Sequence, residues 1–383
     1  MYINRSIENN LEQSIENFPV SAVLGARQTG KTTLVKKIIS RIDNAIYLDL
    51  ERPSDRNKLA DSELFFAANS NHLICLDEIQ LMPELFAVIR SMVDDKTLNL
   101  KFLITGSASP GLLRQSSETL AGRIAFLFLS GFLFTEVEPY VNLNEYWLRG
   151  GFPKSLLAKN DEISYQWREN FMITFLERDL RNFGFNIAPA TLRRFWQMLA
   201  HINGQIINYS ILANSIAHSD TSVRKYVDIL TDTYMVRVLY PYFTNVKKRL
   251  VKRPKIYFRD TGILHALLGI REFNDLLAHP VLGASWEAMC IENILNIYNK
   301  WEPYFYRTSA GAEIDLLLVK STRKIAIEFK VSKSPKVSRG FWNAINDLQV
   351  DKAYVIAPVE QAYPFKENVW VYPLSVFLKL KEL

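Results

Sequence analysis

The stretch GARQTGKTT at residues 25–33 decides the fold of the first part of this 383-residue chain. It fits the spacing G-x-x-x-x-G-K-[ST], follows the apolar run VSAVL and leads into the helical pattern KTTLVKKIIS. Glycines let such a loop turn its backbone N–H groups toward phosphate oxygens, and the helix adds the positive end of its dipole. Strand, loop and helix in this order predict an α/β nucleotide-binding domain rather than a chance glycine-rich turn.

The residues of this loop have different expected roles. Lys31 is expected to reach the β- and γ-phosphates, and Thr32 to offer its hydroxyl to Mg²⁺. The whole loop is predicted to surround the phosphates, and it consists of Gly25, Ala26, Arg27, Gln28, Thr29, Gly30, Lys31, Thr32 and Thr33.

The segment HLICLDEIQ at residues 72–80 supplies acids for the same site. Its apolar part, residues 73–76, predicts a buried parallel strand, so Asp77 would lie at the carboxyl edge where open α/β sheets bind ligands. Asp77 is expected to hold Mg²⁺ together with Thr32, and Glu78 to polarise the attacking water. The alternative is a capped strand end without a catalytic role, and the phosphate loop upstream favours the catalytic interpretation.

A third strand is predicted in NLKFLITGSAS at residues 99–109, with a turn at Thr105, Gly106 and Ser107. A polar side chain at this turn would touch the γ-phosphate or the water. Arg123 lies between a glycine and another apolar strand. In a ring of subunits, such an arginine would reach a neighbour's γ-phosphate.

These segments carry a family resemblance. The strand, loop and helix at 20–39, LDE at 76–78, ITGS at 104–107 and LAGR at 120–123 resemble the AAA+ class of P-loop ATPases. The opening YINR and LRGGFP at 148–153 resemble, more narrowly, a prokaryotic AAA+ subfamily with a winged-helix region and a nuclease-like C-terminal domain. The resemblance implies ATP as the nucleotide, Ser107 as the sensor-1 position, Arg123 as an arginine finger, and a homo-oligomer, possibly a ring.

The middle of the chain changes to helical spacing. Residues 141–188 predict a helical lid or connector, broken by glycines at 150 and 151. Between 189 and 262, three helical patterns precede two β-rich segments, and the third helix has Ser219 or Asp220 as its N-cap. Three helices followed by a β-hairpin predict a winged helix-turn-helix, in agreement with the resemblance.

This region has a concentrated positive charge. The hairpin sequence TNVKKRLVKRPK contains six cations and no acid, and the third helix begins with further cations. Backbone contact with DNA is the interpretation we favour over a solvated turn or a protein-docking module. The candidate residues are Arg224, Lys225, Lys247, Lys248, Arg249, Lys252, Arg253 and Lys255.

The last part of the chain, residues 280–383, predicts a second chemical site. A helix, three strands, a helix and a strand follow the order of the PD-(D/E)XK nuclease core. Asp315 lies on one strand, and Glu328 and Lys330 face the same side of the next. Asp315 and Glu328 would hold Mg²⁺ on a scissile phosphate while Lys330 stabilises charge; the resemblance adds Glu287 as the helical acid. The alternatives are surface charge or a nuclease fold kept only for binding.

Composition and charge limit the function classes. The chain has 48% hydrophobic residues, a net charge of +6 and two cysteines in apolar segments, which predict reduced, buried thiols in a cytoplasmic protein. The start, MYINRSIENN, has no apolar core, and the longest mostly apolar stretch, 125–134, is too short to span a bilayer, so neither a signal peptide nor a membrane partner is predicted.

Together these patterns predict an α/β multidomain protein with an AAA+ core at residues 1–140. The expected function is an ATP-hydrolysing protein that binds and remodels or processes DNA. One alternative is a nucleotide-gated switch with an inert nuclease fold, and another is an ATP-regulated, metal-dependent nuclease. DNA stimulation of the ATPase distinguishes the first from the second, and loss of metal-dependent cleavage in Asp315→Ala identifies the third.

Overall fold

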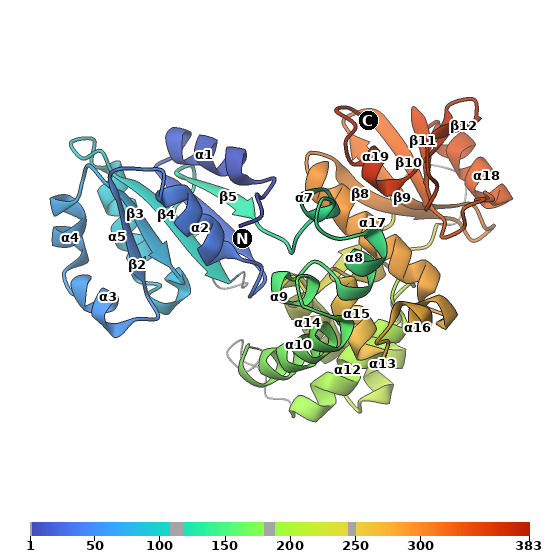
Figure 1. Cartoon of the computed structure of the whole chain (residues 1–383), viewed down its shortest axis with the longest axis horizontal. Coiled ribbons are helices and arrows are strands. Elements are labelled where there is room, and N and C mark those ends of the chain that lie inside the picture. Colours follow the sequence, from blue (N-terminus) through green and yellow to red (C-terminus); the bar gives the residue numbers. More distant parts are fainter. Residues whose placement is uncertain (1, 108–117, 180–187, 244–249) are drawn as a thin grey trace. The chain divides into compact units, whose positions relative to one another are not determined.

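The chain divides into two compact units (Figure 1). The computed structural model describes residues 2–107, 118–179, 188–243 and 250–383. The N-terminal unit is Met1–Phe132 with Asp232–Tyr234, and the C-terminal unit is Leu133–Thr231 with Met235–Leu383. Each has helices and its own β-sheets, so the predicted α/β multidomain class is confirmed. Among the helices of these described parts, none is long and apolar enough to cross a membrane.

A five-stranded parallel sheet with the order β2-β3-β4-β1-β5 forms the centre of the N-terminal unit. The strands are β1 (Val20–Gly25), β2 (Ala45–Asp49), β3 (Leu73–Asp77), β4 (Lys101–Ser107) and β5 (Ile124–Phe128). Neighbouring strands all run parallel, so their carboxyl ends meet at one edge. The N-terminal parallel sheet predicted from the sequence is confirmed.

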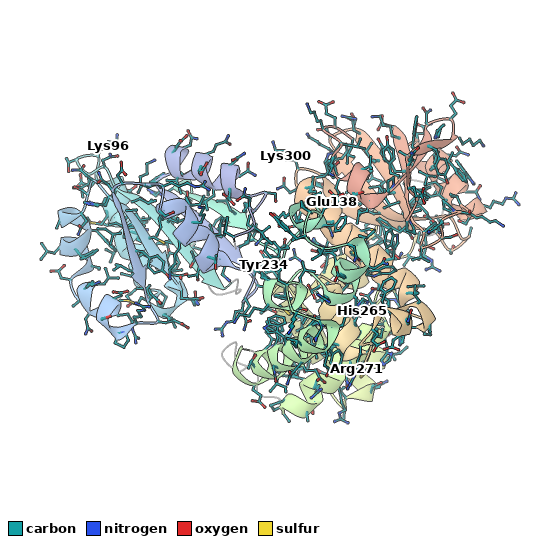
Figure 2. The ribbon with its side chains drawn as sticks, in the orientation of Figure 1. Lys96, Glu138, Tyr234, His265, Arg271 and Lys300 are labelled. Carbon is teal, nitrogen blue, oxygen red and sulfur yellow. The ribbon has the colours of Figure 1, made fainter. Side chains whose placement is uncertain are left out.

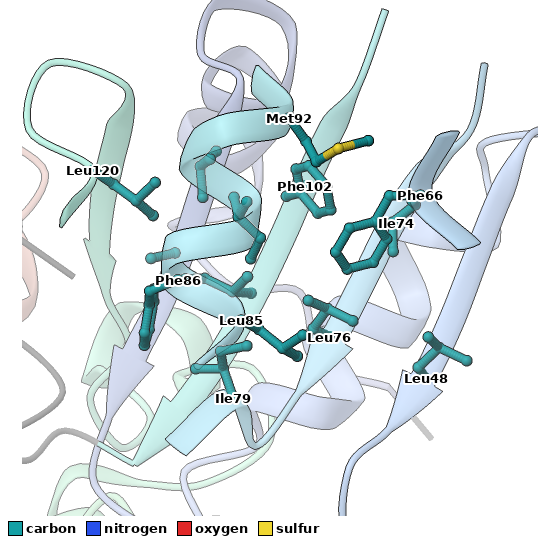
Figure 3. Packing of buried hydrophobic residues seen from close by; sticks show 14 of the residues in the cluster. Leu48, Phe66, Ile74, Leu76, Ile79, Leu85, Phe86, Met92, Phe102 and Leu120 are labelled. Carbon is teal, nitrogen blue, oxygen red and sulfur yellow. The ribbon is translucent and has the colours of Figure 1, made fainter. Parts of the chain in front are cut away.

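Helices cover both faces of this sheet. They are α1 (Glu8–Asn17), α2 (Lys31–Ile39), α3 (Pro53–Lys58), α4 (Ser62–Ala68), η1 (Ile79–Leu81) and α5 (Leu85–Asp94). On one face, Phe86 and Met92 of α5 join the same buried cluster as Leu76 and Phe102 of the strands (Figure 3). On the other, residues of α1 and α2 cluster with Val23 of β1. Both faces are therefore apolar, as expected for a parallel sheet.

The C-terminal unit begins with a series of helices, one of which ends at a turn held by Asp260. They are α7 (Phe134–Val137), α8 (Leu143–Arg149), α9 (Pro153–Leu156), α10 (Asp161–Thr174) and the π-helical η2 (Phe175–Asp179). Asp260 accepts hydrogen bonds from the backbone N–H groups of Gly151 (2.7 Å) and Ile263 (2.9 Å). Gly150, with φ 76°, leaves no room for a side chain, because a Cβ there would lie 2.3 Å from Asp260 Oδ1. Gly150 of LRGGFP thus has a structural reason.

Three helices and a two-stranded antiparallel sheet follow. They are α12 (Pro189–His201), α13 (Tyr209–Ser215), α14 (Asp220–Asp232), β6 (Val236–Leu239) and β7 (Lys255–Phe258). Ser219 caps α14, since its Oγ accepts the backbone N–H of Ser222 at 3.1 Å. The order of elements agrees with the sequence-based expectation for residues 189–262.

A six-stranded mixed sheet ends the chain, in the order β12-β13-β11-β10-β9-β8. Three helices precede it: α15 (Thr261–Leu267), α16 (Phe273–Ala278) and α17 (Leu282–Ile297). Its elements are β8 (Glu302–Arg307), β9 (Glu313–Lys320), β10 (Arg323–Phe329), α18 (Arg339–Leu348), β11 (Lys352–Ile356), β12 (Tyr363–Lys366), β13 (Val369–Tyr372) and α19 (Leu374–Phe377). The run α17-β8-β9-β10-α18-β11 has the predicted order.

Buried polar side chains join the helices of this unit. Ser285 Oγ accepts from Trp147 Nε1 at 2.8 Å and lies 2.7 Å from His265 Nε2, while His265 Nδ1 lies 3.0 Å from the carbonyl of Leu148. Since a carbonyl only accepts, His265 is neutral with its proton on Nδ1. The rings of Trp147 and Trp286 stack edge-on beside it, 5.1 Å apart. This core is closed to water.

Candidate functional site

The phosphate loop connects β1 to α2 at the carboxyl edge of the parallel sheet. A Cβ on Gly25 would lie 2.1 Å from the carbonyl oxygen of Leu129, so the close strand approach requires glycine. Gly30 has φ 94°, a left-handed conformation that also favours glycine, directly before the first helical residue, Lys31. The loop therefore points backbone N–H groups and the start of α2 at one place.

Lys31 lies inside this loop. Its Nζ donates to the carbonyl oxygens of Ala26 (2.8 Å) and Gly25 (3.2 Å), and the hydroxyl of Thr29 donates to Ala26 at 2.9 Å. Burial lowers the pKa of Lys31 to about 8, although Glu78 and Asp77 oppose this change. An anion that replaced the two carbonyls would restore full charge to the ammonium.

The other loop residues lie further from this centre. Arg27 is half-buried, and Gln28 and Thr33 are exposed. Gln28 has φ 61°, so the loop includes a second left-handed residue.

Asp77 is the acceptor for three hydroxyl groups. Thr32 Oγ1 donates to Asp77 Oδ2 at 2.9 Å, Tyr47 donates to the same oxygen at 2.5 Å, and Thr105 donates to Oδ1. The structure therefore brings the predicted metal residues Thr32 and Asp77 together. A hydroxyl and a carboxylate are oxygen donors of the kind that Mg²⁺ prefers, so the residues present fit this ion.

Glu78 follows Asp77 with a strained backbone. Its φ of 59° is left-handed, and its carboxylate accepts a hydrogen bond from Gln80. The backbone N–H of Glu78 lies 3.3 Å from Thr105 Oγ1. Strain of this kind in a non-glycine residue persists where the surroundings hold a functional group in place.

One expectation for the third strand is wrong. The predicted turn at Thr105, Gly106 and Ser107 is the end of β4, which pairs with β1 up to Ser107 opposite Gly25. Because the strand continues, Thr105 lies in the sheet beside Asp77 rather than in a loop. The backbone of Ser107 lies at the edge that carries the phosphate loop.

Arg123 lies at the opposite edge of the sheet from the phosphate loop. Its carbonyl accepts from the backbone N–H of Val20, the first residue of β1, whereas the loop follows the last residue of β1. Its guanidinium forms two hydrogen bonds to Asp94, of 2.6 and 2.8 Å. The structure does not bring Arg123 to the nucleotide site of its own chain.

Arg5 is a residue of this site that sequence reasoning missed. It is 6% exposed, and it donates to the carbonyl of Thr29 in the phosphate loop at 3.0 Å. It also donates to the carbonyls of Ser130 and Gly131, each at 2.9 Å. Arg5 therefore ties the loop to the segment after β5. The motif YINR was the available signal, but nothing in it indicates which backbone the arginine contacts.

A second cluster of charged residues lies in the C-terminal unit. Phe329 N–H donates to Asp315 Oδ2 at 3.1 Å, and Lys330 Nζ donates to Glu328 Oε1 at 2.7 Å. Burial, followed by the charge of Asp315, raises the pKa of Glu328 to about 8. Burial likewise raises the pKa of Glu287 to about 7. The structure thus brings the predicted residues together, but in the described part of the chain no three His, Cys, Asp or Glu side chains are placed to hold a metal ion.

The cationic side chains of residues 247–255 differ in exposure to solvent. Lys255, expected among the DNA-contacting residues, is 4% exposed and forms ion pairs with carboxylates, so this expectation is wrong. Lys252 and Arg253 are exposed, as are Arg224 and Lys225 on α14. The candidates Lys247, Lys248 and Arg249 lie outside the described residues.

Fold and site together define a P-loop ATPase. A family model described as an AAA domain matches residues 17–138, the part that contains the parallel sheet and the phosphate loop. Two models for domains of unknown function, DUF8612 and DUF4143, match residues 140–274 and 282–377. The site residues and this match agree on the AAA class.

Relatives at the level of the whole chain identify the family. A protein of Mycobacterium tuberculosis and one of Mycobacterium bovis, both called uncharacterized, are 40% identical over 374 residues, which is 98% of this chain and 84% of theirs. The chain belongs to the family of these two mycobacterial proteins.

Two solved structures are also similar. The Walker-type ATPase of Pyrococcus abyssi is 17% identical, with 70% of this chain and 96% of that chain covered and a TM-score of 0.49. The RuvB Holliday junction branch migration motor of Thermotoga maritima is 16% identical, with 61% and 89% covered and a TM-score of 0.32.

Proposed function

We propose that this protein hydrolyses ATP at the carboxyl edge of the parallel sheet and uses the reaction to act on DNA. The observation that carries the ATPase site is the contact of Thr32 with Asp77 at 2.9 Å, beside the buried ammonium of Lys31. The proposed homo-oligomer would add Arg123 from a neighbouring subunit.

Each residue of the site would have its own role in ATP hydrolysis. Lys31 would exchange its two carbonyl partners for the β- and γ-phosphates, and the backbone N–H groups at the start of α2 would bind the same oxygens. Thr32 and Asp77 would hold Mg²⁺, which neutralises phosphate charge when bound. Glu78 would orient the attacking water and accept its proton. Ser107 remains our candidate for contact with the γ-phosphate.

A pair of variants tests this assignment. Lys31→Ala is expected to abolish tight ATP binding, because the phosphates lose their countercharge. Glu78→Gln is expected to bind ATP normally and to stop turnover, because the amide does not accept the proton. Binding of a fluorescent ATP analogue and phosphate release would be measured for both, and wild-type turnover in Glu78→Gln would disprove its role.

The proposal of DNA as the partner rests on charge. Lys252 and Arg253 are exposed before β7, and Arg224 and Lys225 are exposed near the start of α14. Exposed cations near the start of a helix and on a hairpin suit backbone phosphates rather than base edges. We propose that residues 189–262 act as a winged helix-turn-helix.

Aromatic side chains support the same surface. Tyr240 and Phe243 are 61% and 59% exposed in the segment after β6. Arg224 lies over the ring of Tyr209, with 4.0 Å from the guanidinium carbon to the ring centre. Exposed rings among cations are a common feature of surfaces that stack on bases.

Salt dependence tests the DNA surface. The double variant Lys252→Ala/Arg253→Ala is expected to reduce affinity for unrelated DNA sequences alike. It should also flatten the slope of log K on log salt by up to about two units, since each neutralised duplex phosphate contributes about 0.9. Lys247→Ala/Lys248→Ala/Arg249→Ala should behave similarly. A matched control is Lys300→Ala/Lys352→Ala, which removes two exposed lysines of the same unit; Lys300 is labelled in Figure 2.

A second candidate function is a nucleotide-gated switch with an inert nuclease-like fold. The position of Lys255 among the carboxylates of the C-terminal unit favours it, because these acids already have a cation. Under this candidate, DNA would not stimulate the ATPase. The rate of phosphate release with and without a panel of DNA structures distinguishes the two functions.

A further inference from the structure

Four carboxylates of the C-terminal unit form a cluster, and three of them contact one lysine. This carboxylate cluster consists of Glu287 on α17, Glu313 and Asp315 on β9, and Glu328 on β10. Lys255 Nζ lies 3.1 Å from Glu313 Oε1, 3.7 Å from Glu287 Oε1 and 3.8 Å from Asp315 Oδ1. The ammonium therefore contacts acids from two different elements at once.

Lys255 enters the cluster from a strand, not from a loop. It is the first residue of β7 and pairs with Leu239 of β6. Tyr257, two residues along the same strand, faces the same side and donates to Glu287 Oε1 at 2.5 Å. The hairpin thus inserts a cation and a hydroxyl side by side into the carboxylate cluster.

The ammonium stays charged in this place. It forms ion pairs with three carboxylates, which neutralise it without a metal ion. A charged ammonium repels a second cation at the same oxygens. A divalent metal ion needs carboxylate oxygens at about 2.0–2.6 Å. The carboxylate oxygens around Lys255 Nζ lie at 3.1, 3.7 and 3.8 Å.

Glu328 belongs to the cluster through Asp315 and not through Lys255. Glu328 is 5% exposed, its Oε1 accepts from Lys330, and its carboxyl interacts with the neighbouring Asp315. The cluster thus has the donors of a cation site and a lysine in that site.

We propose that the ammonium of Lys255 takes the place of a divalent cation in the carboxylate cluster. While the hairpin is seated, the cluster binds neither Mg²⁺ nor Mn²⁺. The nuclease-like site is inactive in this state, and withdrawal of β7 would open it. This inference concerns the resting protein and is independent of the proposed ATPase and DNA functions.

Mn²⁺ binding without nucleotide tests this proposal. The free Mn²⁺ signal in electron paramagnetic resonance would be titrated with wild type, Lys255→Met and Lys255→Met/Asp315→Asn. Lys255→Met is expected to gain one site that binds at least about tenfold more tightly than any background site, and the double variant to lose it. Lys300→Met, which removes an exposed lysine of the same unit, should behave as wild type.

Thermal stability gives a second readout. Mn²⁺ is expected to raise the melting temperature of Lys255→Met and to leave wild type unchanged. If Lys255→Met does not fold without metal, refolding in Mn²⁺ should recover it. Three results would overturn the proposal: wild-type Mn²⁺ binding that is lost in Asp315→Asn, folded Lys255→Met without a new site, or unfolded Lys255→Met that Mn²⁺ does not rescue.

Discussion

Lys31 shows how burial prepares a single residue for its ligand. Its pKa of about 8 without nucleotide means that the ammonium begins to lose its proton just above neutral pH. Phosphates would raise this pKa, so binding above pH 8 must take up a proton. We expect ATP affinity to be constant below about pH 7.5 and to fall about tenfold per pH unit well above pH 8.

Fluorescent-nucleotide titrations between pH 6.5 and 9.5 would measure this slope. Lys96→Ala is a suitable control, because Lys96 is an exposed lysine outside the phosphate loop and should keep the wild-type profile. An affinity that stays flat to pH 9.5 would mean that Lys31 is fully charged before ATP arrives.

For single residues, the sequence predicted which side chains belong to the phosphate site but not all of their hydrogen-bond partners. Lys31, Thr32 and Asp77 have a spacing that only a phosphate loop and an acidic strand end explain. Tyr47 and Thr105 also contact Asp77, but they belong to strands whose register is set by long-range pairing. No local pattern contains that information.

Gly150 decides how α8 ends. Gly150→Ala would place a methyl group against Asp260, which caps α15 and binds Gly151. We expect a loss of about 3 kcal/mol or more in unfolding free energy, from backbone strain and the displaced carboxylate. Gly269→Ala is the control, since its φ of 73° is also positive and a Cβ there meets nothing within 4 Å.

Gly269→Ala should lose only about 1 kcal/mol. Urea unfolding of both variants would be compared. Equal losses would show that Asp260 moves aside freely and that the junction tolerates a side chain.

The helices and strands that have a clear local sequence pattern were predictable. The apolar runs of β1 and β3 and the capped start of α14 were read from local sequence. β2, with the sequence AIYLD, was not predicted; it is an edge strand, and most of its residues are only half-buried. The basic hairpin was treated as one surface, yet Lys255 is buried and Lys252 is exposed. Only the packing of β7 against the carboxylate cluster separates them.

His265 makes the stability of the whole C-terminal unit sensitive to acid. Its position inside this unit is labelled in Figure 2. Burial lowers its pKa from 6.5 to about 3. Because the unfolded chain binds a proton below pH 6.5 and the folded chain does not, this residue's contribution to stability is full above pH 6.5 and is lost as pH falls toward 3.

We expect the titration of His265 to lower the free energy of unfolding by about 1.4 kcal/mol per pH unit as the pH falls from about 6 to 4. His265→Gln should be less stable at pH 7 but should have a shallower acid dependence, measured by urea unfolding across this range. His201→Gln, at an exposed histidine, should keep the wild-type slope. An unchanged slope in His265→Gln would assign acid sensitivity to other groups.

Arg123 would link catalysis to assembly in the proposed homo-oligomer. Since it lies at the far edge of its own sheet, any contact with a γ-phosphate must come from another subunit. We expect Arg123→Ala to lose at least about tenfold in turnover with little change in ATP affinity. Mixing it with Glu78→Gln should restore part of the activity, because each variant supplies what the other lacks.

Arg90→Ala is the control for Arg123, as an exposed arginine of α5. Phosphate release would be followed over a range of protein concentrations by light scattering in parallel. A wild-type monomer with full activity at every dilution would remove Arg123 from the mechanism.

The division into two units has an optical consequence. All seven tryptophans lie between residues 147 and 370, so the indole emission comes only from the C-terminal unit. A fluorescence melt would leave the unfolding of the ATP-binding unit invisible, whereas far-ultraviolet circular dichroism records both. If the units melt independently, ATP should shift the dichroism transition upward and leave the indole transition in place. Tryptophan fluorescence therefore reports the unfolding of the C-terminal unit alone, and its comparison with circular dichroism separates the unfolding of the two units.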